Sequence, residues 1–119
     1  MQSVVLVCGS RGLSPSPAWL ASVVQQFCPG GWLLLHGGAR GVDSSVPSAA
    51  TLLGWECAAI RPNYQLFGRR APLCRNDELL ALSSHVVAVW DGRSRGTGYV
   101  IRQARRLGRP VLVVRPPLG

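Results

Sequence analysis

The chain has 119 residues, of which 47% are hydrophobic, and its formal net charge is +8. This length supports a single domain with one hydrophobic core, which we place over residues 1–119. No apolar run approaches the ~20 residues of a membrane-spanning helix, so we expect no membrane partner. The first residues predict a strand rather than a signal peptide, and we therefore expect a cytoplasmic protein.

Segments typical of strands alternate along the chain with segments typical of helices. In chain order we predict a strand at Val4–Cys8, a helix at Pro17–Phe27, a strand at Trp32–Leu35, a helix at Asp43–Leu53, a strand at Cys57–Ile60, a connection at Arg61–Arg75, a helix at Asn76–Ser83, a strand at Val86–Trp90, a helix at Tyr99–Leu107 and a strand at Val111–Val114. This alternation predicts an α/β fold, a Rossmann-like doubly wound domain with helices on both faces of a parallel sheet. The strands are continuous apolar runs, which fits a sheet buried on both faces.

The four cysteines and two histidines do not predict a metal site. The cysteines are far apart and include no Cys-x-x-Cys pair, which disfavours zinc. Cys8 and Cys57 fall in apolar segments, where a reduced thiol packs as a small hydrophobe. We predict neither a metal nor a cofactor.

The segment from His36 to Asp43 reads HGGARGVD and joins the second strand to the next helix. Glycines permit a tight turn and close approach of a ligand to the backbone. The start of the helix offers unpaired N–H groups to an anion. Arg40 adds a cation, and Asp43 adds an acceptor for a ribose hydroxyl. The alternative is an ordinary strand–helix turn in which Asp43 caps the helix.

In a parallel sheet the segments that follow the strands meet at one edge, where ligands bind. Here those segments are rich in arginine and glycine, which favours a phosphorylated ligand. One of them, Ser94–Gly98, repeats the glycine turn before a helix and serves either as a phosphate site or as a cap. The predicted ligand-binding residues are Gly9, Ser10, Arg11, Gly37, Gly38, Ala39, Arg40, Gly41, Asp43, Arg75, Asn76, Asp91, Ser94, Gly96 and Thr97. Asp43 and Asp91 are also the candidate catalytic acid–base pair, although capping and turn formation account for both.

All 13 cationic residues are arginines, whose planar guanidinium binds phosphate through paired hydrogen bonds. Four arginines of the sheet edge are expected to point into water, namely Arg69, Arg70, Arg93 and Arg95. A second group of arginines has the spacing of one helix face and consists of Arg102, Arg105, Arg106 and Arg109. This spacing predicts either a solvated helix face or a surface that contacts nucleic acid.

Several of these motifs occur together, in order, over almost the whole chain. They are Cys8–Arg11, Gly37–Asp43, Arg75–Asn76, Val89–Gly92, Ser94 and Gly96–Thr97. The ordered set resembles the SLOG superfamily of Rossmann-like domains, which includes the Smf/DprA DNA-processing proteins and the lonely-guy phosphoribohydrolases. It most resembles the small stand-alone branch related to YpsA and YspA. The resemblance implies a nucleotide-type ligand at the two glycine turns and, with right-handed crossovers, a five-stranded sheet of order 3-2-1-4-5.

One departure from that family bears on activity. Lonely-guy enzymes carry Pro-Gly-Gly-x-Gly-Thr-x-x-Glu, whose glutamate acts on the ribosyl bond. In this chain the preceding Pro-Gly-Gly is missing, and Val100 stands where the glutamate would be. The resemblance therefore disfavours phosphoribohydrolase activity.

We therefore expect a sensor or binding protein for a nucleotide or a nucleotide-derived phosphorylated ligand. One alternative is single-stranded nucleic-acid binding of the Smf/DprA type, in which Trp90 or Tyr64 would stack on bases. The other is hydrolysis of the N-glycosidic bond of nucleosides or nucleotides by Asp43 or Asp91. Because relatives of this type often self-associate, we also expect a homo-oligomer.

Overall fold

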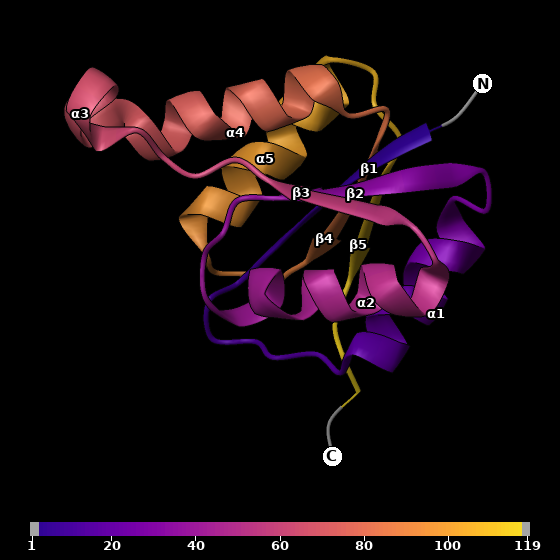
Figure 1. Ribbon diagram of the computed structural model, residues 1–119. Helices are drawn as coiled ribbons and strands as arrows, with labels where there is room; N and C mark the ends of the chain where they lie inside the picture. The colour runs from indigo at the N-terminus through magenta and orange to yellow at the C-terminus, as the bar shows by residue number, and fades with distance from the viewer. Residues whose placement is uncertain (1–2, 118–119) are drawn as a thin grey trace.

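A single parallel sheet organises the molecule, which we describe from a computed structural model (Figure 1). The strands are β1 (Ser3–Gly9), β2 (Gly31–His36), β3 (Glu56–Ala59), β4 (His85–Val89) and β5 (Val111–Val114). Every neighbouring pair is parallel and the order is β3-β2-β1-β4-β5, which confirms the predicted topology. The structure describes residues 3–117, so residues 1–2 and 118–119 of the predicted domain lie outside the described residues.

Helices cover both faces of the sheet, as predicted for a doubly wound domain (Figure 1). The main helices are α1 (Pro17–Phe27), α2 (Val46–Leu53), α4 (Ala71–Leu82) and α5 (Arg95–Arg106), and the short ones are the 3-10 helix η1 (Gly41–Ser45), α3 (Tyr64–Phe67) and the 3-10 helix η2 (Gly68–Arg70). Side chains of α1 and α2 pack on one sheet face, and side chains of α4 and α5 pack on the other.

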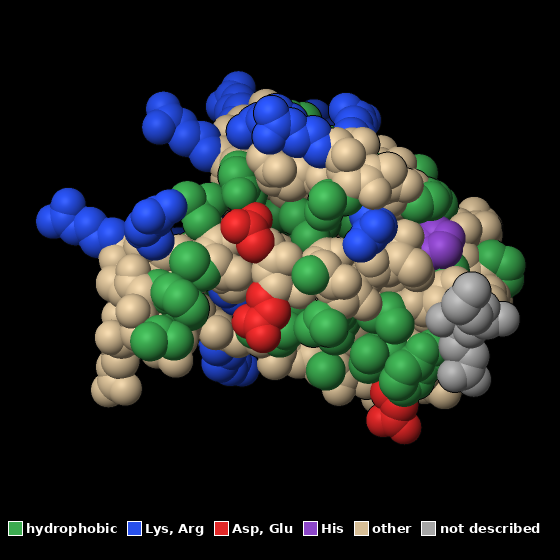
Figure 2. Space-filling model, turned by 90° about the horizontal axis from the view of Figure 1, so that it is seen from above, with side chains coloured by type: hydrophobic (Ala, Val, Ile, Leu, Met, Phe, Trp, Pro, Cys, Tyr) green, Lys and Arg blue, Asp and Glu red, His purple; other side chains and the backbone are tan. Residues whose placement is uncertain are grey.

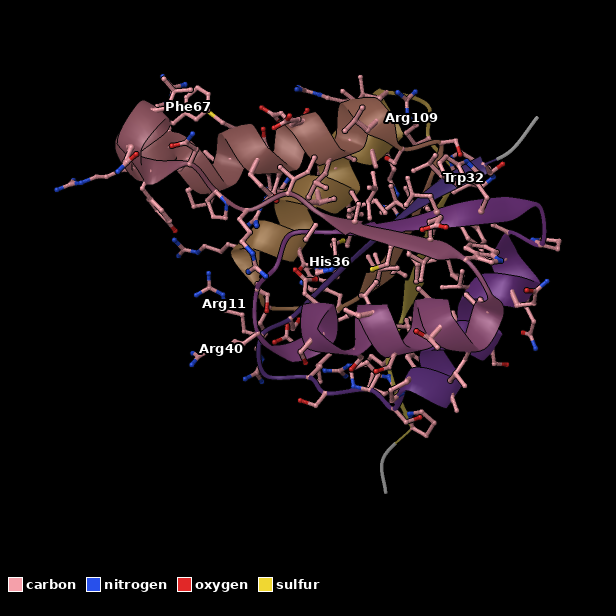
Figure 3. The ribbon with its side chains drawn as sticks, in the orientation of Figure 1. Arg11, Trp32, His36, Arg40, Phe67 and Arg109 are labelled. Carbon is pink, nitrogen blue, oxygen red and sulfur yellow. The ribbon has the colours of Figure 1, made fainter. Side chains whose placement is uncertain are left out.

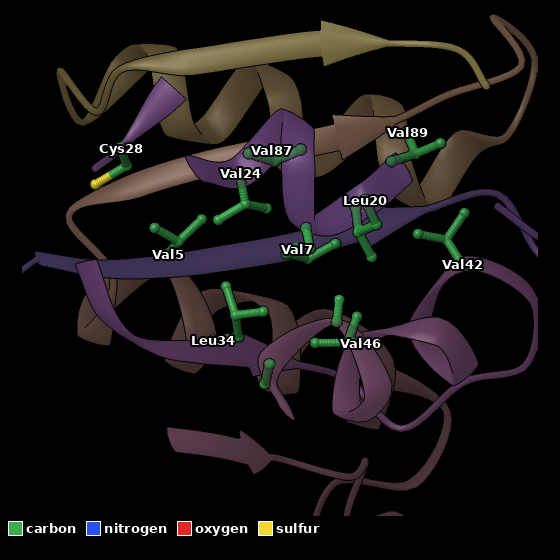
Figure 4. Close-up of a cluster of buried hydrophobic side chains, with 13 residues drawn as sticks. Val5, Val7, Leu20, Val24, Cys28, Leu34, Val42, Val46, Val87 and Val89 are labelled. Carbon is green, nitrogen blue, oxygen red and sulfur yellow. The ribbon is translucent and has the colours of Figure 1, made fainter. Parts of the chain in front are cut away.

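The two core layers follow from the alternation of side chains along each strand. In β1, Val5 and Val7 point toward α1 and α2 and pack with Leu20, Val24 and Val46 (Figure 4). On the opposite face, a second cluster joins β1, β2, α4 and α5 through Leu6, Leu35, Leu79, Leu80 and Val100. This two-sided burial explains why the central strands read as continuous apolar runs.

The helix predicted at Asn76–Ser83 begins earlier than expected. The structure places α4 at Ala71–Leu82, and α3, η2 and the first residues of α4 together occupy most of the predicted connection Arg61–Arg75. Pro72 lies in the first turn of α4, where its missing N–H costs no intrahelical hydrogen bond. Asn76, the first residue of the predicted helix, therefore lies in the middle of α4.

The helices beside the two glycine turns also begin at other residues than predicted. α5 starts at Arg95 rather than Tyr99, so Gly96 and Thr97 belong to its first turn. Before α2, the chain forms η1, and Asp43 lies inside that 3-10 helix rather than at the start of an α-helix. Pro47 then falls in the first turn of α2, which is the only place in a helix where proline fits without loss.

Strand β3 differs from the other strands because all four of its residues are exposed. Cys57 was expected to pack as a buried hydrophobe in this strand, and that expectation is wrong. The apolar sequence of this segment does not signal burial, because β3 lies at the edge of the sheet.

Candidate functional site

A pocket of about 320 Å³ opens at the edge of the sheet where the strands end. Its floor is the end of β1, from Leu6 to Gly9, and one wall comes from α4. The loop between β2 and η1 and the first turn of α5 complete it. The pocket therefore lies where ligands bind in open parallel sheets.

The loop between β2 and η1 is held by the carboxylate of Asp43. Its Oδ2 atom accepts hydrogen bonds from the backbone N–H groups of Gly37 and Ala39, at 3.1 Å and 3.2 Å. The N–H of Gly38, between them, donates to Nδ1 of His36 at 3.1 Å. Asp43 therefore braces this loop instead of capping α2. The three N–H groups of the glycine turn are bound within the protein and do not face a ligand.

Two arginines hold the same loop through its carbonyl groups. Nη1 of Arg75 donates to the carbonyl oxygen of Gly37, and Nη1 of Arg61 donates to that of Gly38 at 2.9 Å. A Cβ added at either glycine would collide with the corresponding guanidinium. Gly37 and Gly38 thus make room for the guanidinium groups of Arg75 and Arg61, so no ligand is needed to account for glycine at these two positions.

Burial shapes the charges around this loop. Loss of solvent raises the pKa of Asp43, and the N–H groups of Ala39 and Gly37 and the nearby His36 and Arg75 oppose that rise. Burial lowers the pKa of His36, which agrees with an unprotonated Nδ1 that accepts the Gly38 N–H. Burial raises the pKa of the Cys8 thiol on the pocket floor, as it does for Asp43, so this thiol stays protonated.

The loop between β4 and α5 is braced by a second carboxylate, that of Asp91. Its Oδ1 atom accepts from the N–H groups of Arg93 and Ser94, each at 2.8 Å, and from the hydroxyl of Ser94. These hydrogen bonds lower the pKa of Asp91 to about 2. Ser10 ties β1 to this loop, because its hydroxyl oxygen accepts the N–H of Asp91 at 3.0 Å. Asp91 is therefore an ionised structural acceptor, and a carboxyl with so low a pKa is a poor general acid near neutral pH.

The first turn of α5 contrasts with both braced loops. No side chain caps it, and the first intrahelical donor is the N–H of Gly98, which bonds to the carbonyl oxygen of Ser94 at 3.1 Å. The N–H groups of Arg95, Gly96 and Thr97 precede that bond and are left at the positive end of the helix.

The side chain of Thr97 distinguishes this helix end from an ordinary one. Thr97 is only 6% exposed and lines the pocket. Within residues 3–117 its hydroxyl makes no hydrogen bond, although buried hydroxyls normally have a partner. Every fully enclosed polar side-chain atom among these residues has a hydrogen-bond partner, so the unpartnered hydroxyl of Thr97 is partly accessible, in a residue that lines the pocket.

Three arginines line the pocket, and two of them are uncommitted. Arg75 is engaged with Gly37 and Asn76. Arg11 and Arg95 are exposed pocket residues that donate no side-chain hydrogen bond within the described part of the chain. Arg11 and Arg40 point away from the sheet at this edge (Figure 3). The pocket thus combines exposed cations with a helix N-terminus and a hydroxyl that makes no hydrogen bond within residues 3–117.

Most of the predicted ligand-binding residues line this pocket. They are Gly9, Arg11, Gly37, Ala39, Asp43, Arg75, Asn76, Ser94, Gly96 and Thr97. The others, Ser10, Gly38, Arg40, Gly41 and Asp91, lie in the flanking loops and outside its lining.

Sequence reasoning missed several residues of the lining. Arg95 was expected to point into water and, although exposed, it borders the pocket. Of the α4 wall, Arg75 and Asn76 were predicted, whereas Pro72 and Leu79 were missed because Pro72 was taken to precede the helix. Their spacing of three and four residues marks one helix face and would have revealed this wall.

The described part of the chain contains neither a metal centre nor a helix able to span a membrane. Within residues 3–117, no group of three or more His, Cys, Asp or Glu side chains is placed to hold a metal ion. Across the same residues, no helix has both the length and the apolar character needed to cross a membrane.

Comparison with known proteins identifies a relative from a bacteriophage. The chain is 31% identical over 116 residues to the Gene 61 protein of Mycobacterium phage D29, and the match covers 91% of this chain and 93% of that protein. The chain belongs to the family of this Gene 61 protein. No protein-family model and no solved structure matches the chain. The name of the Gene 61 protein specifies no activity, so the function of this chain is inferred from the pocket.

Proposed function

We propose that this protein binds a phosphorylated small molecule of the nucleotide type, with its phosphate at the first turn of α5. The hydroxyl of Thr97 is the observation that carries the proposal, because Thr97 is only 6% exposed, lines the pocket and makes no side-chain hydrogen bond within residues 3–117. A phosphate oxygen would accept from this hydroxyl and from the N–H groups of Gly96 and Thr97. Apart from its chain neighbours and the backbone of its own helix, an added Cβ at Gly96 would meet nothing within 4 Å among the described residues, so there is open space beside this turn.

Charge supports the same placement. Arg11 and Arg95 border the pocket and are free to pair with phosphate oxygens. Among the described residues, Asp43 is the only carboxylate in the lining, and it already accepts two backbone hydrogen bonds. A pocket of about 320 Å³ is at the lower end of the size range for small-molecule sites, which suits one nucleotide. The resemblance to the SLOG superfamily supports a nucleotide-type ligand at this turn.

Calorimetric titration tests the proposal directly. We expect saturable binding of one or more members of a panel of inorganic phosphate, ribose 5-phosphate and nucleoside mono-, di- and triphosphates. Thr97→Val keeps the side-chain shape but removes the hydroxyl, and should weaken binding roughly threefold to tenfold. Arg11→Gln removes a charge-assisted contact and should weaken it roughly tenfold to hundredfold.

Matched controls separate the site from general effects. Thr51→Val removes a hydroxyl that donates to the carbonyl oxygen of Pro47 on exposed α2, and Arg105→Gln removes an exposed charge near the end of α5. Both should bind like the unmodified chain. If no panel member binds, or if Thr97→Val and Arg11→Gln bind as tightly as their controls, the proposed site is wrong.

Single-stranded nucleic acid is a second candidate ligand, because aromatic and cationic residues are exposed together on α3 and η2. Tyr64 is 59% and Phe67 45% exposed, and Arg69 and Arg70 follow directly. Phe67 projects from the outer side of α3 (Figure 3). Trp90 is a poorer stacking residue, because it is half-buried and its Nε1 donates to the carbonyl oxygen of Ser94.

Fluorescence anisotropy with labelled single strands tests this candidate at low and near-physiological salt. Binding that uses stacking should persist at the higher salt and fall in Tyr64→Ala, whereas purely ionic binding vanishes. Replacing Arg102, Arg105 and Arg106 tests whether the exposed face of α5 contributes. The hydrolase alternative draws no support from the geometry, because Asp43 and Asp91 are both occupied in bracing loops.

A further inference from the structure

We propose that β3 is the contact surface for a second copy of this chain, and that two β3 strands pair antiparallel across a two-fold axis. The sheet ends at β3, and all four residues of the strand are exposed. In Figure 1, β3 crosses the front of the molecule between α4 and α2, with no segment over it. This proposal concerns a different surface from the phosphate pocket and does not depend on it.

The direction of the backbone N–H and C=O groups of β3 shows which of them do not face β2. The N–H of Ile60 donates to the carbonyl oxygen of His36 in β2. Because successive residues of a strand point their backbone groups to opposite sides, Ala58 also faces β2. The N–H and C=O groups of Cys57 and Ala59 therefore point outward from the sheet edge. A buried or shared edge would satisfy these groups.

These two residues are self-complementary. When the two-fold axis passes at Ala58, Cys57 of each copy stands opposite Ala59 of the other, and each such pair can exchange two N–H···O=C hydrogen bonds. The side chains at positions 57, 58 and 59 are only Cys, Ala and Ala. The side chains of the two paired strands therefore leave room for the roughly 4.8 Å spacing between neighbouring strands.

The other sheet edge is protected, which selects β3. Strand β5 is flanked by Pro110 on one side and by Pro116 and Pro117 on the other. Prolines and charges are the usual means of preventing a sheet edge from pairing. Within β3 there is no proline, and the only charged residue is Glu56.

Charge favours a second copy as the occupant. Antiparallel pairing brings the acidic start of each strand, Glu56, beside the end of the other strand, which Arg61 follows. Glu56 stands in register with Leu33, whose side chain faces the α4 layer. On α4, Asp77 and Glu78 are exposed on this same side of the sheet, where acidic side chains relieve the positive charge (Figure 2). A chain of net charge +8 can therefore self-associate here more easily than through its arginine-rich edge.

Light scattering coupled to gel filtration, over a concentration series, tests the proposal with one variant and a matched control. Ala59→Pro removes an outward N–H without touching the pairing to β2, and should convert the dimer to a monomer. Val113→Pro makes the same change on β5. The N–H of Val113 also points outward, because the carbonyl oxygens of Pro110 and Val114 accept bonds from β4. Val113→Pro should leave the dimer intact.

A second variant and a second measurement distinguish loss of the dimer from misfolding of the chain. Cys57→Arg places a charge on the edge without changing the backbone, and should also give a monomer with an unchanged circular dichroism spectrum. Amide exchange followed by NMR should show protection of Cys57 and Ala59 that increases with protein concentration. The proposal is overturned if the unmodified chain is monomeric throughout the series. It is equally overturned if the dimer survives Cys57→Arg, or if Val113→Pro abolishes it as fully as Ala59→Pro does.

Discussion

Replacing Asp43 by alanine tests whether this carboxylate organises the pocket loop. The substitution removes the acceptor of two backbone hydrogen bonds, from Gly37 at 3.1 Å and from Ala39 at 3.2 Å. Gly37 is buried, whereas Ala39 is half-buried and can turn to water. An orphaned buried donor costs about 1–3 kcal/mol, and a partly exposed one costs less. We therefore expect Asp43→Ala to lose about 2–4 kcal/mol of the free energy of unfolding.

Asp43→Asn separates the hydrogen bonds from the charge. Both N–H groups bond to the same oxygen, Oδ2, so a single amide oxygen can still accept both. We expect Asp43→Asn to lose less than half as much stability as Asp43→Ala at neutral pH.

Chemical denaturation followed by tryptophan fluorescence measures these changes, since the chain has 4 tryptophans. The midpoint should fall while the slope stays constant, which indicates a change in stability rather than in the unfolded state. The loss for Asp43→Ala corresponds to a fall of roughly 8–16 °C in Tm for a domain of this size.

The pH dependence provides a further check on Asp43. Burial raises the pKa of Asp43 in the folded chain, so its ionisation lowers stability as pH rises from the unfolded pKa through the folded pKa. Asp43→Asn removes this titration and should be most destabilising at low pH, with a smaller deficit near neutrality. If Asp43→Ala unfolds at the same midpoint as the unmodified chain, the loop does not depend on this carboxylate and the reasoning fails.

Two further predictions concern the loops around the pocket. Hydrogen bonds hold the pKa of Asp91 in the folded chain at about 2, so the stability that ionised Asp91 contributes is present above the pKa of an aspartate in the unfolded chain and is lost as pH falls toward 2. Asp91→Asn should therefore be less stable than the unmodified chain at about pH 6 and equally stable near pH 2. Stability profiles that run parallel over this pH range would contradict the prediction. Gly41 has φ +79°, and a Cβ there would strike the backbone of Arg11, whereas Gly92 has φ +81° with open space around it. Because of the backbone conformation alone, Gly92→Ala should lower the free energy of unfolding by about 1–3 kcal/mol, and Gly41→Ala should lower it further. Thermal unfolding measures both changes, and equal losses would show that the contact with Arg11 relaxes freely.

The pattern of apolar runs and punctuating residues was sufficient to predict the architecture. Each strand needs only a short apolar segment, and each helix needs an amphipathic one, so alternation in the sequence carries directly into a doubly wound sheet. The edge that carries the pocket followed from the same logic, because parallel strands all end on one side. Helix starts were less predictable. Pro72 resembles a helix breaker in sequence, yet the structure uses it inside the first turn of α4.

The roles of the site residues could not be predicted from local sequence. The glycines at 37 and 38 suggested close approach of a ligand, but Arg75 and Arg61, distant along the chain, occupy that space. Asp43 and Asp91 suggested caps or catalytic acids, and three-dimensional packing made them acceptors for loop N–H groups. Local sequence determines which backbone conformations are accessible, and so it determined the strand–helix alternation and the edge where the pocket lies. Only the tertiary structure decides which donors and acceptors meet, because those partners are many residues apart. It left the hydroxyl of Thr97 without a hydrogen-bond partner among residues 3–117.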